Sequence, residues 1–175
     1  MGDAVFRELL SETAAIMRPR VTVDGEGVPA TPRYEQVSAA VPARIMPRST
    51  ASEDDLLGRM EDITHLAFLE PADLRPSDRL VTRPVATALA EDVWAGASVL
   101  PVASSEGFRD GQSVEVGEEE RIVTAVAAGA LTVAPALAEA HEAGEAVRVL
   151  RRFEVIEVVD EAGAGHHLRA VVREL

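Results

Sequence analysis

Short segments of alternating polarity, separated by turns rich in glycine and proline, run through most of the chain. In residues 168–173, Leu168, Ala170 and Val172 alternate with Arg169, Val171 and Arg173. This period of two places successive side chains on opposite faces of a β-strand. Similar short segments recur along the chain, for example at 64–70 and 153–159. The pattern predicts an all-β fold, a small β-barrel with long loops.

The repeated strand pattern is interrupted in a way that predicts a second domain. Residues 74–81 and 153–159 look like adjacent strands, yet 85–150 lies between them with turns and strand patterns of its own. That segment holds eleven acidic residues and three arginines, so it carries −8 of the net charge of −13. We therefore expect an inserted small β-domain at 85–150, leaving from one hairpin tip of a discontinuous host domain formed by 1–84 and 151–175.

Composition narrows the classes of function. A net charge of −13 argues against a protein that wraps nucleic acid, because binding to phosphates needs a cationic surface. The chain has no cysteine, which removes disulfides and thiolate metal sites. No apolar run approaches the ~18 residues of a membrane span, so we expect no membrane partner. The first residues lack a basic region before an apolar stretch, so no signal peptide is expected.

No catalytic or cofactor motif is present, and we expect no enzyme, no cofactor and no metal site. The sequence has no G-x-S-x-G, P-loop or H-E-x-x-H pattern. His166 and His167 are adjacent, so on a strand they point to opposite faces and do not share an ion. We expect His141 to pack within a loop, His65 to face solvent or a neighbour, and the three glutamates at 118–120 to be solvated.

Several segments, taken in order, resemble a known family. They are "VPARIMPRS" (41–49), "THLAFLEPADLRPSDRLV" (64–81), "FEVIEVV" (153–159) and the terminal "HHLRAVVREL". Together they resemble the head-closure proteins of long-tailed phages, also called head-to-tail stoppers or head-tail joining proteins. The resemblance covers 1–84 and 151–175, about three-fifths of the chain. The segment 85–150 instead resembles short β-modules of phage tail and fibre proteins.

The resemblance implies a structural virion protein of the phage neck. It would be assembled in the host cytoplasm as a homo-oligomeric ring between the portal-adaptor ring protein and the tail terminator protein. It would retain packaged double-stranded DNA, which passes through its lumen without sequence-specific binding, and would offer a platform to the tail. Two alternatives stay open. One is a tail terminator or another tail-completion ring protein. The other is a host-surface or glycan-binding module carried by the insert, in which Trp94 either stacks on sugar or packs at the hinge.

Two sets of residues follow from the resemblance. The loop 47–62 corresponds to a channel plug. There we expect an acidic ring of Glu53, Asp54 and Asp55 in the lumen and closure of the bore by Leu56, Leu57 and Met60. Four arginines are expected to contact acids of adjacent subunits or of the adaptor ring: Arg44, Arg48, Arg151 and Arg152.

Overall fold

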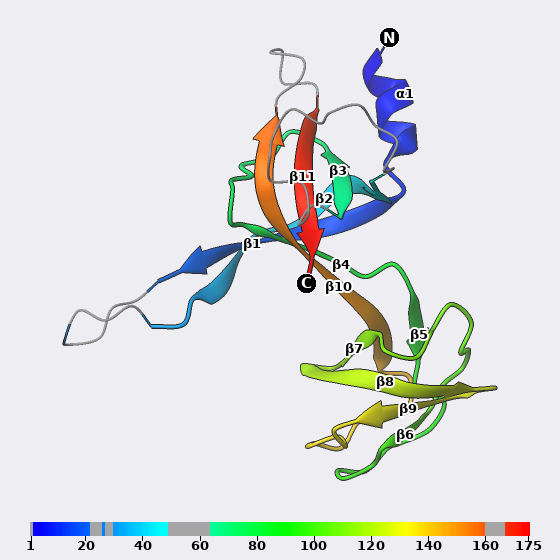
Figure 1. Ribbon diagram of the computed structural model, residues 1–175. Coiled ribbons are helices and arrows are strands. Elements are labelled where there is room, and N and C mark those ends of the chain that lie inside the picture. Colours follow the sequence, from blue (N-terminus) through cyan, green and yellow to red (C-terminus); the bar gives the residue numbers. More distant parts are fainter. Residues whose placement is uncertain (1, 22–25, 27–29, 49–63, 160–166) are drawn as a thin grey trace. The chain divides into compact units, whose positions relative to one another are not determined.

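The computed structural model describes residues 2–21, 26, 30–48, 64–159 and 167–175. One helix, α1 (Gly2–Leu9), precedes a series of antiparallel strands (Figure 1). The strands are β1 (Glu12–Arg20), β2 (Arg33–Pro47), β3 (His65–Leu69), β4 (Arg79–Thr82), β5 (Ala86–Ala88), β6 (Val99–Pro101), β7 (Ser113–Val116), β8 (Glu119–Ala127), β9 (Ala130–Ala134), β10 (Ala146–Val159) and β11 (Leu168–Glu174). The prediction of an all-β chain is confirmed.

The chain divides into two compact units, and the first consists of Met1–Thr82 with Arg152–Leu175. Its strands follow the order β11-β3-β2-β1-β4-β10, and β10 also pairs with β11, so the hydrogen bonding closes into a ring. Alternating residues point inward, as in β3, where every second side chain is buried. They form one apolar core around Phe153, which is fully buried.

Strand β2 is 15 residues long, and its two ends have different neighbours. Its last residues, 43–47, pair with β3 on one side, and Ala43 pairs with Glu12 of β1 on the other, so this part is not an edge. Its first residues pair with β1 alone among the described strands. There the two strands form a hairpin arm, Met17–Arg20 with Arg33–Gln36, that extends from the ring (Figure 1).

The second unit is Arg83–Arg151, so its limits differ by one or two residues from the expected domain 85–150. Its strands follow the order β5-β10-β7-β8-β9-β6. A bridge between Leu89 and Val102 brings the chain after β5 back to the end of β6, where Ala90 N donates to Pro101 O at 2.9 Å. The hydrogen bonding therefore closes here as well. The core of this unit shares no residue with that of the first.

The boundary between the units falls inside a strand. Residues 147–150 of β10 pair with β7 in the second unit, whereas Phe153–Val159 pair with β11 in the first. The strand predicted at 153–159 is therefore the end of one longer, continuous strand. On the other side, β4 ends at Thr82 and lies next to β10 in the first ring. The chain thus leaves and returns on neighbouring strands of that ring.

Candidate functional site

The predicted channel-loop residues lie outside the described part of the chain. They are Glu53, Asp54, Asp55, Leu56, Leu57 and Met60. The ends of the surrounding connection are described and lie together, because Arg48 N donates to Thr64 O at 2.9 Å. The connection therefore starts and ends on the paired strands β2 and β3. Its position in a lumen stays a prediction.

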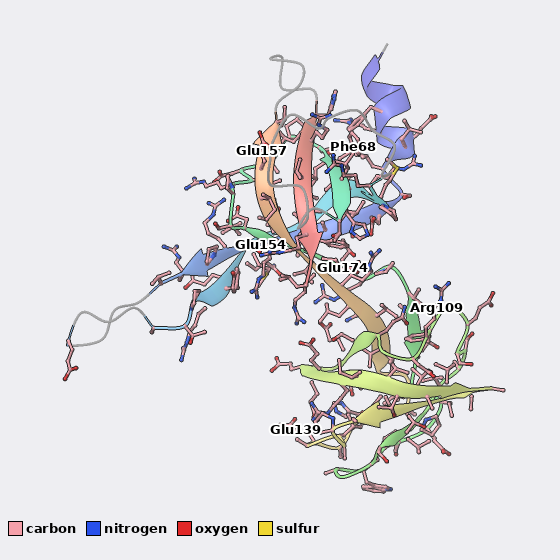
Figure 2. The ribbon with its side chains drawn as sticks, viewed as in Figure 1. Phe68, Arg109, Glu139, Glu154, Glu157 and Glu174 are labelled. Carbon is pink, nitrogen blue, oxygen red and sulfur yellow. The ribbon has the colours of Figure 1, made fainter. Side chains whose placement is uncertain are left out.

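The four arginines predicted at subunit contacts are divided between the two units. Arg44 is half-buried on β2 and pairs in register with Phe68 of β3, which is labelled in Figure 2. Arg151 ends the second unit, whereas Arg152 resumes the first. Arg48, Arg151 and Arg152 each already take part in an interaction within the chain. Their role between subunits stays a prediction.

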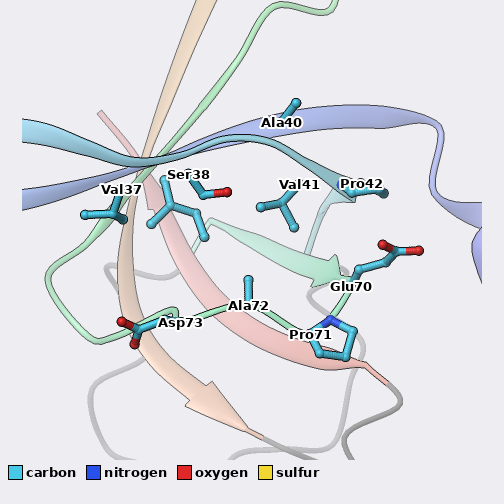
Figure 3. A pocket seen from close by; sticks show the side chains of 10 residues that line it. Val37, Ser38, Ala40, Val41, Pro42, Glu70, Pro71, Ala72 and Asp73 are labelled. Atoms are coloured by element: carbon cyan, nitrogen blue, oxygen red, sulfur yellow. The ribbon is translucent and has the colours of Figure 1, made fainter.

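A groove that the sequence did not predict lies in the first unit, beside β2 (Figure 3). Its volume is about 390 Å³, and it runs between residues 37–42 of β2 and the connection 70–73 that follows β3. Valine, alanine and proline side chains make up most of its lining, and Glu70 and Asp73 supply the charges. Glu70 N donates to Pro42 O at 3.1 Å, which holds the two walls together at one end.

An ion-pair network fixes the wall of this groove to the base of the hairpin arm. Arg18 donates from Nε and Nη2 to the two carboxylate oxygens of Asp78, at 3.0 and 2.9 Å. Its Nη1 also donates to Asp73 at 2.9 Å. Hydrogen bonds from Arg75 and then from Arg18 lower the pKa of Asp73 to about 2, although burial opposes the shift. Because Asp78 is almost fully buried, this bidentate pair is a fixed part of the fold.

A second polar cluster holds a loop of the second unit. The His141 ring is buried between two carboxylates, with Nε2 at 3.0 Å from Glu119 and Nδ1 at 3.1 Å from Glu145. A neutral imidazole donates from one of its two nitrogens, and His141 places one nitrogen beside each carboxylate. His141 packs in a loop as predicted. The expectation of solvated glutamates at 118–120 is wrong for Glu119, whose side chain is only 11% exposed.

Glu119 is the centre of this cluster. Its oxygens accept hydrogen bonds from the backbone N–H groups of Ala138, at 2.7 Å, and Glu139, at 2.8 Å; Glu139 is labelled in Figure 2. Arg121 also pairs with it. Burial alone would raise the pKa of Glu119, but these donors and His141 outweigh burial and lower the pKa from 4.5 to about 2. The carboxylate therefore stays charged and works as a structural clamp.

The structure bears on the alternatives stated for two single aromatic residues, Trp94 and His65. Trp94 belongs to the second unit and is 76% exposed, so it does not pack at a hinge. His65, expected to face solvent or a neighbour, is buried, and its ring meets Phe153 edge-on at a centroid distance of 5.1 Å. His166 lies outside the described residues, and the ring of His167 lies 4.7 Å from that of Phe6.

Within the described ranges, no three histidine or acidic side chains are placed to hold a metal ion. No described helix is both long and apolar enough to span a membrane. The sequence matches no protein-family profile, and no curated protein is significantly similar to it.

Proposed function

We propose that the chain is a structural subunit of a phage neck, which forms a ring between the portal adaptor and the tail. One observation carries the proposal. The segments that resemble head-closure proteins lie in β2, β3, β4, β10 and β11, and these are all members of a single closed ring of strands. The segment Arg83–Arg151 interrupts them in sequence but has a core of its own. The resembling parts thus belong together in space as well as in order.

The charge of the chain fits a wall past which DNA slides. With a net charge of −13, the surface repels phosphate rather than binding it. Exposed arginine pairs between subunits contribute only about 0–1 kcal/mol each, so buried β-surface has to supply most of the stability of a ring. We expect salt at about 1 M, where the Debye length is about 3 Å, to weaken the assembly without abolishing it.

The position of the protein in the particle tests the proposal directly. A map of the neck at low resolution should show a ring of this chain directly between the adaptor and the tail terminator. A second experiment deletes residues 50–60. The rings should stay intact in negative-stain images, while the amount of nuclease-accessible DNA in tailless heads should increase. Substitution of Glu53, Asp54 and Asp55 by the matching amides tests charge alone with the loop length unchanged. Full DNA retention by the deletion variant would refute the prediction that the loop 47–62 closes the channel.

The alternative of a tail terminator makes a different prediction for binding. Such a protein would bind the end of the tail tube and would not bind the portal-adaptor ring. Pull-down of the purified chain with each of these two partners separates the alternatives.

A second function, recognition of glycans by the second unit, is favoured by the exposure of Trp94. An exposed indole offers an apolar face on which a sugar ring can stack. Binding of the full chain to a glycan array should then be lost in Trp94→Ala and retained in Trp94→Phe. Equal binding by the alanine variant, or binding by neither the wild type nor the variants, would remove this function.

A further inference from the structure

Trp94 stands on a stretch of chain that is hydrogen-bonded to a facing segment on both sides of the tryptophan. Before it, Val93 and His141 exchange two backbone hydrogen bonds, at 2.9 and 2.8 Å. After it, Leu137 N donates to Ala97 O at 2.8 Å. The backbone at Trp94 is therefore held in place, while its side chain is 76% exposed and free to contact a ligand.

Four exposed carboxylates lie on the same two segments. They are Glu91, Asp92, Glu139 and Glu142. Asp92 lies opposite Glu142 and both point outward, because each is next to a residue of the buried antiparallel pair described above. Asp92 Oδ1 also accepts a hydrogen bond from Ala143 N at 2.8 Å, which fixes this carboxylate beside the facing segment. The exposed indole is therefore surrounded by acidic side chains.

The negative charge around Trp94 has no arginine beside it. In the described ranges, no arginine forms an ion pair with any of these four carboxylates. The segments that carry them contain no arginine of their own. Arginines elsewhere in the second unit contact other acids, for example Arg83 and Arg148 with Glu115. A ligand that reaches the indole therefore meets a negative surface.

The surroundings of the indole decide which glycans it can accept. The face of a tryptophan ring stacks on the apolar face of a sugar, and it attracts a cation more strongly than other aromatic rings do. Carboxylates beside the ring add attraction for a cation, and they repel an anion, which suppresses binding of the wrong partner. Uronic acids, sialic acids and phosphorylated sugars are thus disfavoured, and a sugar with a protonated amino group is favoured.

We propose that the glycan bound at Trp94 carries free amino groups, so that a sugar ring stacks on the indole while its ammonium group lies beside Glu139 and Glu142. This inference rests on the glycan recognition proposed above and names the class of sugar. Stacking on the indole supplies the contact that all glycans share. The charges supply the selectivity, because exposed pairs add little to affinity but distinguish a cation from a neutral group.

The chain contains a single tryptophan, so its fluorescence reports on this site alone. Titrations of the full chain use the tetrasaccharides of glucosamine, N-acetylglucosamine and glucose, which share one linkage and differ at one ring substituent. At about pH 6, where a primary amine is protonated, we expect the Kd for the glucosamine tetrasaccharide to be at least about fivefold lower than for the other two. At about 1 M salt, where the Debye length is about 3 Å, the three values should converge.

Variants of the exposed glutamates separate charge from stacking. A double variant, Glu139→Gln with Glu142→Gln, keeps the indole and removes two charges. Its preference for the glucosamine tetrasaccharide should fall to less than about twofold, while binding of the two neutral tetrasaccharides stays unchanged. The matched control is Glu106→Gln, the same change at an exposed glutamate elsewhere in the second unit, which should keep the full preference.

The outcomes distinguish this inference from the glycan function on which it rests. Equal Kd values for the three tetrasaccharides, or an unchanged preference in the double variant, overturn the selectivity for amino sugars and leave glycan recognition in place. If no tetrasaccharide changes the fluorescence of Trp94, glycan recognition fails and the inference fails with it. Tighter binding of an oligolysine peptide than of the glucosamine tetrasaccharide also overturns the inference, because the surface would then select a basic polypeptide.

Discussion

The clamp at Glu119 makes a prediction about acid stability. Glu119→Gln keeps the size of the side chain but removes the charge that accepts hydrogen bonds from Ala138 and Glu139 and pairs with Arg121. The amide offers one acceptor oxygen in place of two, so it leaves at least one of these donors without its partner. We expect the variant to be less stable than the wild type at neutral pH.

The size of the effect follows from the pKa. The difference between 4.5 and about 2 corresponds to about 3 kcal/mol at about 1.4 kcal/mol for each pH unit. Solvent at the rim of the cluster screens part of this, so we expect a loss of about 1–2 kcal/mol in Glu119→Gln. Because folding lowers the pKa, the contribution is present above pH 4.5 and is lost as the pH falls toward 2.

Urea unfolding between pH 2 and pH 7 measures this difference. Circular dichroism gives the free energy of unfolding, and hydrogen exchange read by mass spectrometry assigns the change to the second unit. The matched control is Glu118→Gln, the same chemical change at an exposed neighbour. The stability of the wild type and of Glu119→Gln should converge near pH 2. A gap that stays constant over this range, or equal stability of the two glutamine variants at pH 7, would refute the argument.

Four further predictions concern the stability of the two units. Phe153→Ala removes a fully buried ring from the first core and should cost about 3–5 kcal/mol in urea unfolding, against less than about 1 kcal/mol for the part-exposed Ile156→Ala. Gly117→Ala should destabilise the protein more than Gly111→Ala. Both glycines have positive φ, which costs a non-glycine residue about 1–2 kcal/mol, but only at Gly117 would the new Cβ meet another side chain, 2.5 Å from Glu145 Oε1. Arg18→Met should lower the thermal midpoint, whereas Arg20→Met, which removes only an exposed pair with Glu35, should leave it nearly unchanged; equal midpoints would contradict the role given to Asp78. Replacement of Arg83–Arg151 by a short Gly-Ser turn should leave a folded first unit, because Thr82 and Arg152 lie on neighbouring strands, and an unfolded product would end the interpretation of an inserted domain.

The parts of the fold that depend on local pattern could be predicted from the sequence. Alternation predicted the strands at β3 and β11, because each is short and buries every second side chain over most of its length. The start of β2 could not be predicted, because Pro29 and Pro32 are typical of a connection and nothing in residues 33–38 shows that β1 will pair with them. Proline near a strand end interrupts the alternating pattern that predicts a strand, although the adjacent residues can still pair in a hairpin.

The polar clusters were harder to predict because they join residues far apart in sequence. Glu119 and His141 were each noted, but only the pairing of strands in the second unit brings them within 3.0 Å of each other. The groove depends on the same kind of information, since its walls come from β2 and from the connection after β3. For Trp94 the sequence could not show whether the side chain is buried or exposed. A lone aromatic residue near a domain boundary suggests packing, and only the structure shows that the indole is exposed.

The continuity of β10 makes the two junctions of the second unit unequal in evolution. At the first junction, residues 83–85 lie outside any strand, so an added or lost residue there changes only a connection. At the second, a single added residue near Arg151 would turn every following side chain of the strand to the other face. Phe153 and Val155 would then leave the core of the first unit. Among related sequences, we expect length variation to collect at the first junction and to be absent from the second.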